Sequence, residues 1–201
     1  MSVARAGKQL LAAAERGDHA AMRHLLAARA PVESRDARHR TPLMIAIRQH
    51  DATAVKLLLK AGADINAQDN IKDSPFLLAG AMGDVEILKL LIPHGPDFSK
   101  VNRYGGSALI PAAERGHVAA VKLLLKAGVP VDHVNRLGWT ALLEAVILGQ
   151  GGAPHQAIVR ALIAAGADVD LADKDGVTSL RHAKSRGFTA IAKLLEAAGA
   201  S

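Results

Sequence analysis

Histidine is the residue type that most invites a search for catalytic or metal-binding chemistry, because the chain contains nine of them. His19 and His24 are five residues apart, so they do not share one helix face as ligands at i and i+4 would. The sequence has no His-Glu-x-x-His motif. Most of the other histidines fall at expected loops or helix ends, as His117 does after Gly116. We therefore interpret the histidines as capping or turn residues and expect no metal site and no cofactor.

Two glycine-rich segments share parts of catalytic motifs without completing them. Gly105-Gly106-Ser107 lacks the second glycine and the strand–turn–helix context of a nucleophile elbow. Ser107 is better explained as a hydroxyl cap at the start of a helix. The segment 149–152 has no preceding strand and no Lys followed by Ser or Thr, so it is not a P-loop. That segment is either a tolerated surface insertion or a loop that touches a partner.

Glu144 has the least ordinary position among the carboxylates, because it interrupts the apolar run 141–148. It either faces a binding surface, or forms hydrogen bonds among the helices, or is a solvated or locally paired carboxylate. No second carboxylate is close enough in sequence to form an acid–base pair. The chain has no Cys, which excludes thiolate nucleophiles and disulfides. We expect no enzymatic activity, and a small-molecule site near Glu144 and the 149–152 loop remains a third hypothesis.

The amino-acid composition favours a fold of stacked helices. Apolar residues make up 50% of the 201 residues, but aromatic residues only 2%. Small side chains allow close packing in thin layers instead of one thick core. No window approaches the roughly 18 uncharged apolar residues of a membrane span, and the first residues do not resemble a secretory signal. We expect a cytoplasmic, monomeric protein with no membrane partner.

Internal repeats have a period of 33 residues. The segment Ala54–Gly62 recurs without change at 120–128, an offset of 66 residues. Ala14-Glu15-Arg16-Gly17 recurs at 113–116, an offset of 99 residues. Both offsets are multiples of 33. A fixed period of this size indicates stacked repeats that bury a continuous core between neighbours.

These segments resemble the ankyrin repeat family, and the resemblance covers nearly the whole chain. The segment 41–46, Thr-Pro-Leu-Met-Ile-Ala, is similar to the family's Thr-Pro-Leu-His-x-Ala motif. The segment 55–66 is similar to its second helix and the entry to its hairpin. The resemblance implies an all-α ankyrin-repeat solenoid of about six helix–turn–helix units in a single domain, 1–201. The repeats are expected near 5–36, 37–69, 70–102, 103–135, 136–173 and 174–201.

Two departures from the repeat predict local changes. Arg29 stands where other repeats have the glycine that ends the second helix, so we expect a different cap there. Pro93 falls in the last turn of a second helix and is expected to shorten or kink it. Repeat 5 also has five extra residues around 150–154.

The resemblance implies that a partner binds a concave groove lined by hairpin tips and first helices. The only Trp and the only Tyr fall at adjacent tips, with apolar residues and Arg beside them, a combination typical of binding hot spots. The alternative is that both rings join neighbouring hairpins. The candidate partner-binding residues are Trp139, Tyr104, Arg103, Arg136, Leu137, Arg115, Met82, Ile71, Leu148, Arg38, Arg40 and Arg48.

The net charge of +6 lies in the first third of the sequence, where residues 1–60 hold 11 Lys and Arg against 5 Asp and Glu. A basic end favours an acidic partner. We expect a protein–protein scaffold or adaptor whose partner is another protein of acidic character. The alternative is binding of a polyanion or nucleic acid through the basic N-terminal repeats. Nucleic acid is less favoured, because no known motif is present and the basic residues lack interleaved aromatics.

Overall fold

The computed structural model describes residues 2–201, and in that range it contains twelve α-helices, one 3-10 helix and no strand. The all-α fold of six helix–turn–helix repeats is therefore confirmed. Contacts divide the chain into two compact units. Unit 1 comprises the chain up to Ala79 together with Glu86–Lys100, and unit 2 comprises Gly80–Val85 together with Val101–Ser201.

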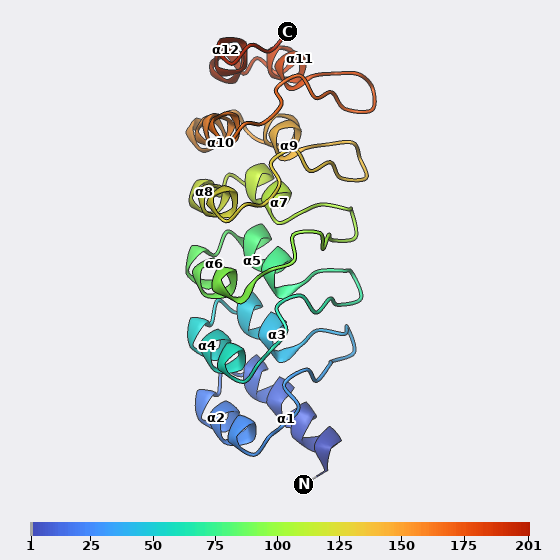
Figure 1. Ribbon diagram of the computed structural model, residues 1–201, viewed down its shortest axis with the longest axis vertical. Helices are drawn as coiled ribbons and strands as arrows, with labels where there is room; N and C mark the ends of the chain where they lie inside the picture. The colour runs from blue at the N-terminus through green and yellow to red at the C-terminus, as the bar shows by residue number, and fades with distance from the viewer. Residues whose placement is uncertain (1) are drawn as a thin grey trace. The chain divides into compact units, whose positions relative to one another are not determined.

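In unit 1, the first helices α1 and α3 pack against each other, and the second helices α2 and α4 form a second layer on one side of them. The hairpin loops extend from the other side of the first helices (Figure 1). The elements of this unit are α1 (Val3–Glu15), α2 (His19–Ala27), α3 (Pro42–Arg48), α4 (Ala52–Lys60), most of α5 (Pro75–Met82) and of α6 (Val85–Leu91), and η1 (Ile92–His94).

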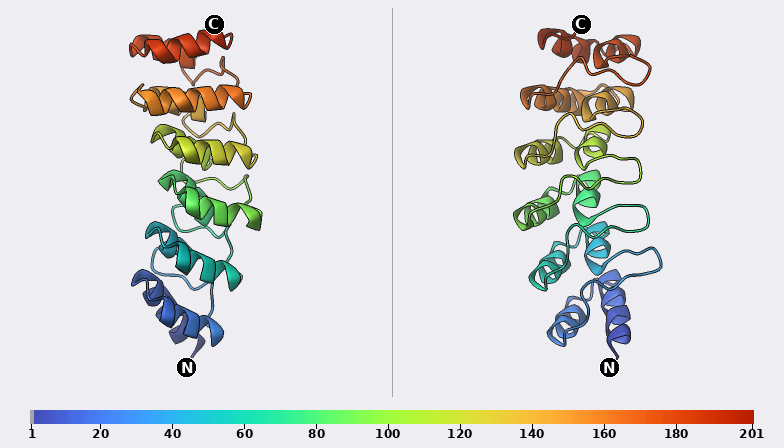
Figure 2. Two further views of the ribbon diagram at one scale, coloured as in Figure 1. Left: turned by 90° about the vertical axis from the view of Figure 1, so that its left-hand side faces the viewer. Right: turned by 45° about the vertical axis from the view of Figure 1, so that its right-hand side comes forward.

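Unit 2 repeats this layering, with α7, α9 and α11 packed in one row and α8, α10 and α12 in a second row. Figure 2 shows the second helices of this unit lying one above the next. Its helices are α7 (Leu109–Glu114), α8 (Val118–Lys126), α9 (Ala141–Ile147), α10 (Ala153–Ala164), α11 (Ser179–Ser185) and α12 (Thr189–Ala197). Helix α10 has twelve residues, three more than α8, because part of the insertion around 150–154 extends its start.

Hydroxyl side chains cap the N-termini of most of the first helices. The Thr41 hydroxyl accepts the backbone N–H of Met44 at 3.2 Å, and Thr140 and Thr178 cap α9 and α11 in the same way. Each cap satisfies an N–H group that has no partner inside the helix.

The prediction that Ser107 caps the first helix of repeat 4 is wrong. Helix α7 begins only at Leu109, and the buried Ser107 hydroxyl forms no hydrogen bond within residues 2–201. Pro111 provides the reason. In repeat 2, the N–H of Ile45 donates to the carbonyl of Thr41 at 3.1 Å. The proline at the equivalent position has no N–H to donate, so the first turn of α7 is lost.

The prediction of a different cap at Arg29 is also wrong. Arg29 has φ +58°, in the same left-handed region as Gly62 at φ +84°. The N–H of Ala30 still donates to the carbonyl of Leu25 at 2.9 Å. The structure therefore keeps the cap at a cost of about 1–2 kcal/mol in backbone strain.

Pro93 has the predicted effect. Helix α6 ends at Leu91 after seven residues, and the chain continues as the 3-10 helix η1, which contains the proline. The second helix of repeat 3 is therefore shorter than the nine-residue α4 and α8.

The core of each unit consists mainly of Leu, Ile, Val and Ala side chains between the two helix layers, as Leu58 in unit 1 and Leu124 in unit 2 illustrate. Among residues 2–201, no helix has the length and apolar character needed to cross a membrane.

Candidate partner-binding site

The hairpin of repeat 5 is built around the buried side chain of Asn135. Its amide oxygen accepts the backbone N–H of Leu137 at 2.9 Å and of Trp139 at 3.1 Å. Its amide nitrogen donates to a Glu144 carboxylate oxygen at 2.8 Å. Glu144 in α9 therefore holds Asn135, the residue that shapes the hairpin tip, in place. Of the interpretations left open for this carboxylate, the structure shows the one in which it forms a hydrogen bond inside the fold.

The same turn recurs in every hairpin. The residue equivalent to Asn135 accepts two backbone N–H groups of its own tip in each case, which fixes the path of the loop. These residues are Asp36, Asp69, Asn102 and Asp173.

Burial raises the pKa of Glu144 to about 7, and the nearby negative charge of Glu114 adds to the effect. The hydrogen bond from Asn135 opposes the rise without reversing it. The carboxyl therefore changes its charge near neutral pH while it remains inside the protein.

Large apolar side chains are exposed at the predicted surface of unit 2. Tyr104, Leu137 and Leu148 are 53%, 49% and 47% exposed. Trp139 is half-buried, so only part of its ring is available for contact with a partner. The guanidinium of Arg103 lies 4.7 Å from the centroid of the Tyr104 ring, a cation–π contact.

Two tip cations connect neighbouring hairpins. The backbone N–H of Arg136 donates to the carbonyl of Tyr104 at 2.9 Å, and its guanidinium donates to the carbonyl of Arg103 at 3.0 Å. The ammonium of Lys174 donates in turn to the carbonyl of Arg136. Each long side chain thus covers the preceding tip and keeps the hairpins in register.

The ends of the first helices in unit 2 form the other part of this surface. Exposed Arg115 donates to the carbonyl of Ala81 at 2.7 Å, beside the half-buried Met82. An open cavity of about 250 Å³ lies where α7 and α9 end. It is lined by Glu114, Arg115, Gly116, Leu148, Gln150, Gly152, Pro154 and His155.

The candidate residues of unit 1 differ in their exposure and in their contacts within the fold. Ile71, Arg38 and Arg48 are exposed. Arg40 is only 21% exposed and forms an ion pair with Asp36 at 2.6 Å. The predicted basic cluster of the N-terminal repeats is thus partly engaged within the fold, and this weakens the case for a polyanion site there.

Several histidines connect neighbouring repeats. His155, buried at the start of α10, contacts the carbonyl of Glu114 at 2.8 Å, and His19 contacts the carboxylate of Asp51 at 2.6 Å. The ring of His117 bonds the carbonyl of Ala81, while burial and Arg115 lower its pKa. Within residues 2–201, no group of three or more His, Asp or Glu is arranged to hold a metal ion.

Sequence reasoning missed the contact of Asn135 with Glu144. The sequence signal is a polar residue in the first helix nine positions after the Asn or Asp of the hairpin. Asp173 and His182 share this separation, and they are also in contact, at 2.7 Å.

Comparisons with known proteins agree with the repeats. A family model described as "Ankyrin repeats (3 copies)" matches residues 6–69 and 76–173, and another, "Ankyrin repeats (many copies)", matches 49–92. No curated protein matches the chain.

Solved structures show the same fold over nearly the full length. An ankyrin repeat domain from Acinetobacter baumannii is 53% identical, with 96% of this chain and 98% of that one covered and a TM-score of 0.93. A second ankyrin repeat protein is 44% identical, with coverage of 94% and 97% and a TM-score of 0.92. The ankyrin repeat domain of Bcl-3, of the IkappaB family, is 26% identical, with coverage of 96% and 86% and a TM-score of 0.86. The repeats, their caps and these matches together establish that the chain belongs to the ankyrin repeat family.

Proposed function

We propose that this protein is a binding scaffold whose partner protein docks on the hairpin tips and first-helix ends of unit 2. Ankyrin repeats are generally protein–protein interaction modules. The observation that carries the location is the exposure of Tyr104, Leu137 and Leu148 in a chain with few aromatic residues. Large apolar side chains kept in water at the rim of an ordered scaffold are typical of interaction sites.

The cavity beside Leu148 supports a protein partner over a small-molecule substrate. Its volume of about 250 Å³ is below the roughly 300–1,000 Å³ of small-molecule sites. It can accept one side chain of a partner. The charges at its edge, Glu114 and Arg115, would help to orient that side chain.

The cations around the apolar side chains favour a partner that has carboxylates beside its apolar anchor. Arg103 already lies over the Tyr104 ring, and Arg115 is exposed at the end of α7. Such charges mainly steer and orient the partner, while buried apolar contacts supply most of the affinity. A standard interface would cover about 800 Å² on each partner.

The test is affinity capture from the source cell with the wild-type chain and with a Tyr104→Ala/Leu137→Ala variant. Both side chains are half exposed, so the melting temperature should change little. We expect the specific partner to be lost, with a Kd at least about 30-fold weaker in a titration of the purified pair, a loss of about 2 kcal/mol.

The matched control is Val3→Ala, at a side chain that is 73% exposed in α1 of unit 1. This variant should retain full binding. Equal capture by the wild type, the double variant and the control would show that the partner uses another surface.

A further inference from the structure

The second helix of every repeat either carries more positive than negative charge or is balanced by a single Glu. Helices α2, α4, α6, α8, α10 and α12 together contain eight Lys and Arg against two Glu, a net charge of +6. Every repeat places a cation at the same position. These six residues are Arg23, Lys56, Lys89, Lys122, Arg160 and Lys193, and Lys60 and Lys126 lie one turn further on.

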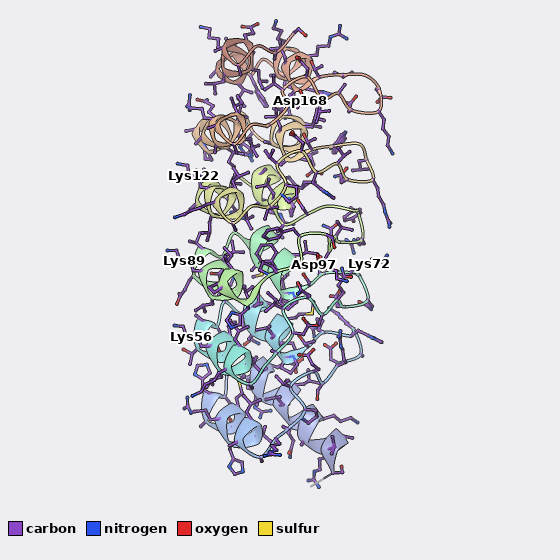
Figure 3. The ribbon with its side chains drawn as sticks, in the orientation of Figure 1. Lys56, Lys72, Lys89, Asp97, Lys122 and Asp168 are labelled. Atoms are coloured by element: carbon purple, nitrogen blue, oxygen red, sulfur yellow. The ribbon has the colours of Figure 1, made fainter. Side chains whose placement is uncertain are left out.

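All eight cations are exposed, and within residues 2–201 none forms a hydrogen bond or ion pair with a carboxylate. Figure 3 shows Lys56 and Lys89 of unit 1 on the second-helix side, away from the hairpin that carries Lys72. In unit 2, Lys122 lies on the corresponding side of α8. Each unit therefore presents its own row of free cations.

The carboxylates, by contrast, are largely used inside the fold. Asp51 accepts the N–H of Ala54 at the start of α4, and Asp132 accepts the N–H of Asp168 from the following repeat. In unit 1, Glu33 accepts the N–H of Asp64 in the same manner. Acidic residues thus hold turns together, whereas the cations of the second helices have no structural contact to explain them.

The surroundings of each row restrict its partner. No large apolar side chain is exposed on these helices, so the row offers neither an anchor for a folded protein nor a wedge for a lipid bilayer. It also has no Phe, Tyr or Trp ring for stacking on single-stranded bases. Affinity must then come from the release of counterions, which is greatest from the densely charged backbone of a duplex.

We propose that the second helices of each unit form a nucleic-acid surface that contacts the phosphate backbone of a duplex without recognising its sequence. Six of the eight cations are Lys, a point charge suited to single phosphates. Neighbouring helices stand about 8–10 Å apart, so each row can reach several phosphates along the duplex. This surface is separate from the tips proposed for the protein partner.

The experiment measures binding of a mixed-sequence 30-base-pair DNA duplex by fluorescence anisotropy at several salt concentrations. We expect a Kd of about 10⁻⁴–10⁻⁶ M at physiological salt, unchanged when the sequence is scrambled. The variant Arg23→Gln/Lys56→Gln/Lys89→Gln should weaken binding and reduce the slope of log K against log salt by about one for each contact removed.

The control variant removes three exposed cations elsewhere, Lys8→Gln/Arg38→Gln/Arg48→Gln, and lowers the net charge equally. It should retain most of the binding, and Tyr104→Ala should retain all of it. An equal loss in both triple variants would overturn the proposal, because net charge alone would then explain the binding. Tighter binding to single-stranded DNA, polyglutamate or phosphatidylserine vesicles than to the duplex would also overturn it.

Discussion

The hairpins of repeats 5 and 6, both in unit 2, have one scaffold and two different surfaces. Asn135 and Asp173 each accept two backbone N–H groups of their own tip. The first hairpin exposes Leu137, whereas the second exposes Lys174 and Asp175. The residues that shape the loop are therefore distinct from those that face water, and one scaffold can present different partners with different chemistry.

Each of these two hairpins has a contact between its Asn or Asp and a first-helix residue, and the pKa of the acid in that contact shifts in opposite directions in the two repeats. In repeat 5 the neutral Asn135 meets the buried Glu144, whose pKa is raised to about 7 by burial. In repeat 6 the carboxylate of Asp173 meets His182 at 2.7 Å, and its pKa is lowered by the N–H of Val177 and then by His182. Placement of the acid in the helix or in the hairpin decides whether the fold favours its neutral or its charged form.

The largest expected difference between the repeats concerns the turn between their two helices. A methyl group on Gly149 would lie 2.0 Å from the carbonyl oxygen of Ala145 and 2.4 Å from the His155 ring. Gly187 has φ +70° and nothing within 4 Å of such a methyl group. Gly149→Ala should cost more than about 3 kcal/mol by overpacking, and Gly187→Ala about 1–2 kcal/mol by backbone strain alone.

Urea unfolding of both variants checks this order. Similar losses would mean that the loop of repeat 5 can move aside, and the contrast between the two turns would then disappear.

The second largest effect is expected in the pH dependence of stability that Glu144 causes. Its carboxyl keeps a proton in the folded chain that the unfolded chain releases near pH 4.5, so stability falls as pH rises from about 4.5 to 7. The Glu144→Gln variant removes this loss and still accepts the bond from Asn135. It should be more stable above pH 7, by at most about 3 kcal/mol.

The measurement is the free energy of unfolding of the wild type and of Glu144→Gln at pH values from 4 to 8.5. Parallel curves for the two proteins would show that Glu144 is ionised inside the fold at little cost.

The smallest effect is expected at Asp173 and has the opposite sign. Because its pKa is lowered from 3.8, its contribution is present above about pH 4 and is lost as pH falls through the folded pKa. Asp173→Asn keeps the turn, as Asn135 does in repeat 5, but loses the charge facing His182. We expect a loss of about 1 kcal/mol at pH 7 and a smaller loss at pH 3.

Thermal unfolding at the two pH values tests this third prediction. A loss at pH 3 as large as at pH 7 would mean that the turn itself had been damaged. The pairs in repeats 5 and 6 would then differ in geometry as well as in charge.

The sequence by itself determined the repeats, their period and most of the ends of their helices, because caps and helix stops depend on residues within a few positions of each other. The cap at Thr41 and the shortened helix at Pro93 are predicted correctly for that reason. Ser107 is not, because Pro111, four residues on, removes the hydrogen bond that would have drawn the serine into the helix.

Only the tertiary structure decided which charges are free and which are engaged. It paired Arg40 with Asp36, buried Glu144 against Asn135 and left the cations of the second helices in water. The energy of a charge depends on its burial and on the groups around it, which come from other parts of the fold. A repeat pattern places a side chain on a helix, but packing determines what that side chain meets.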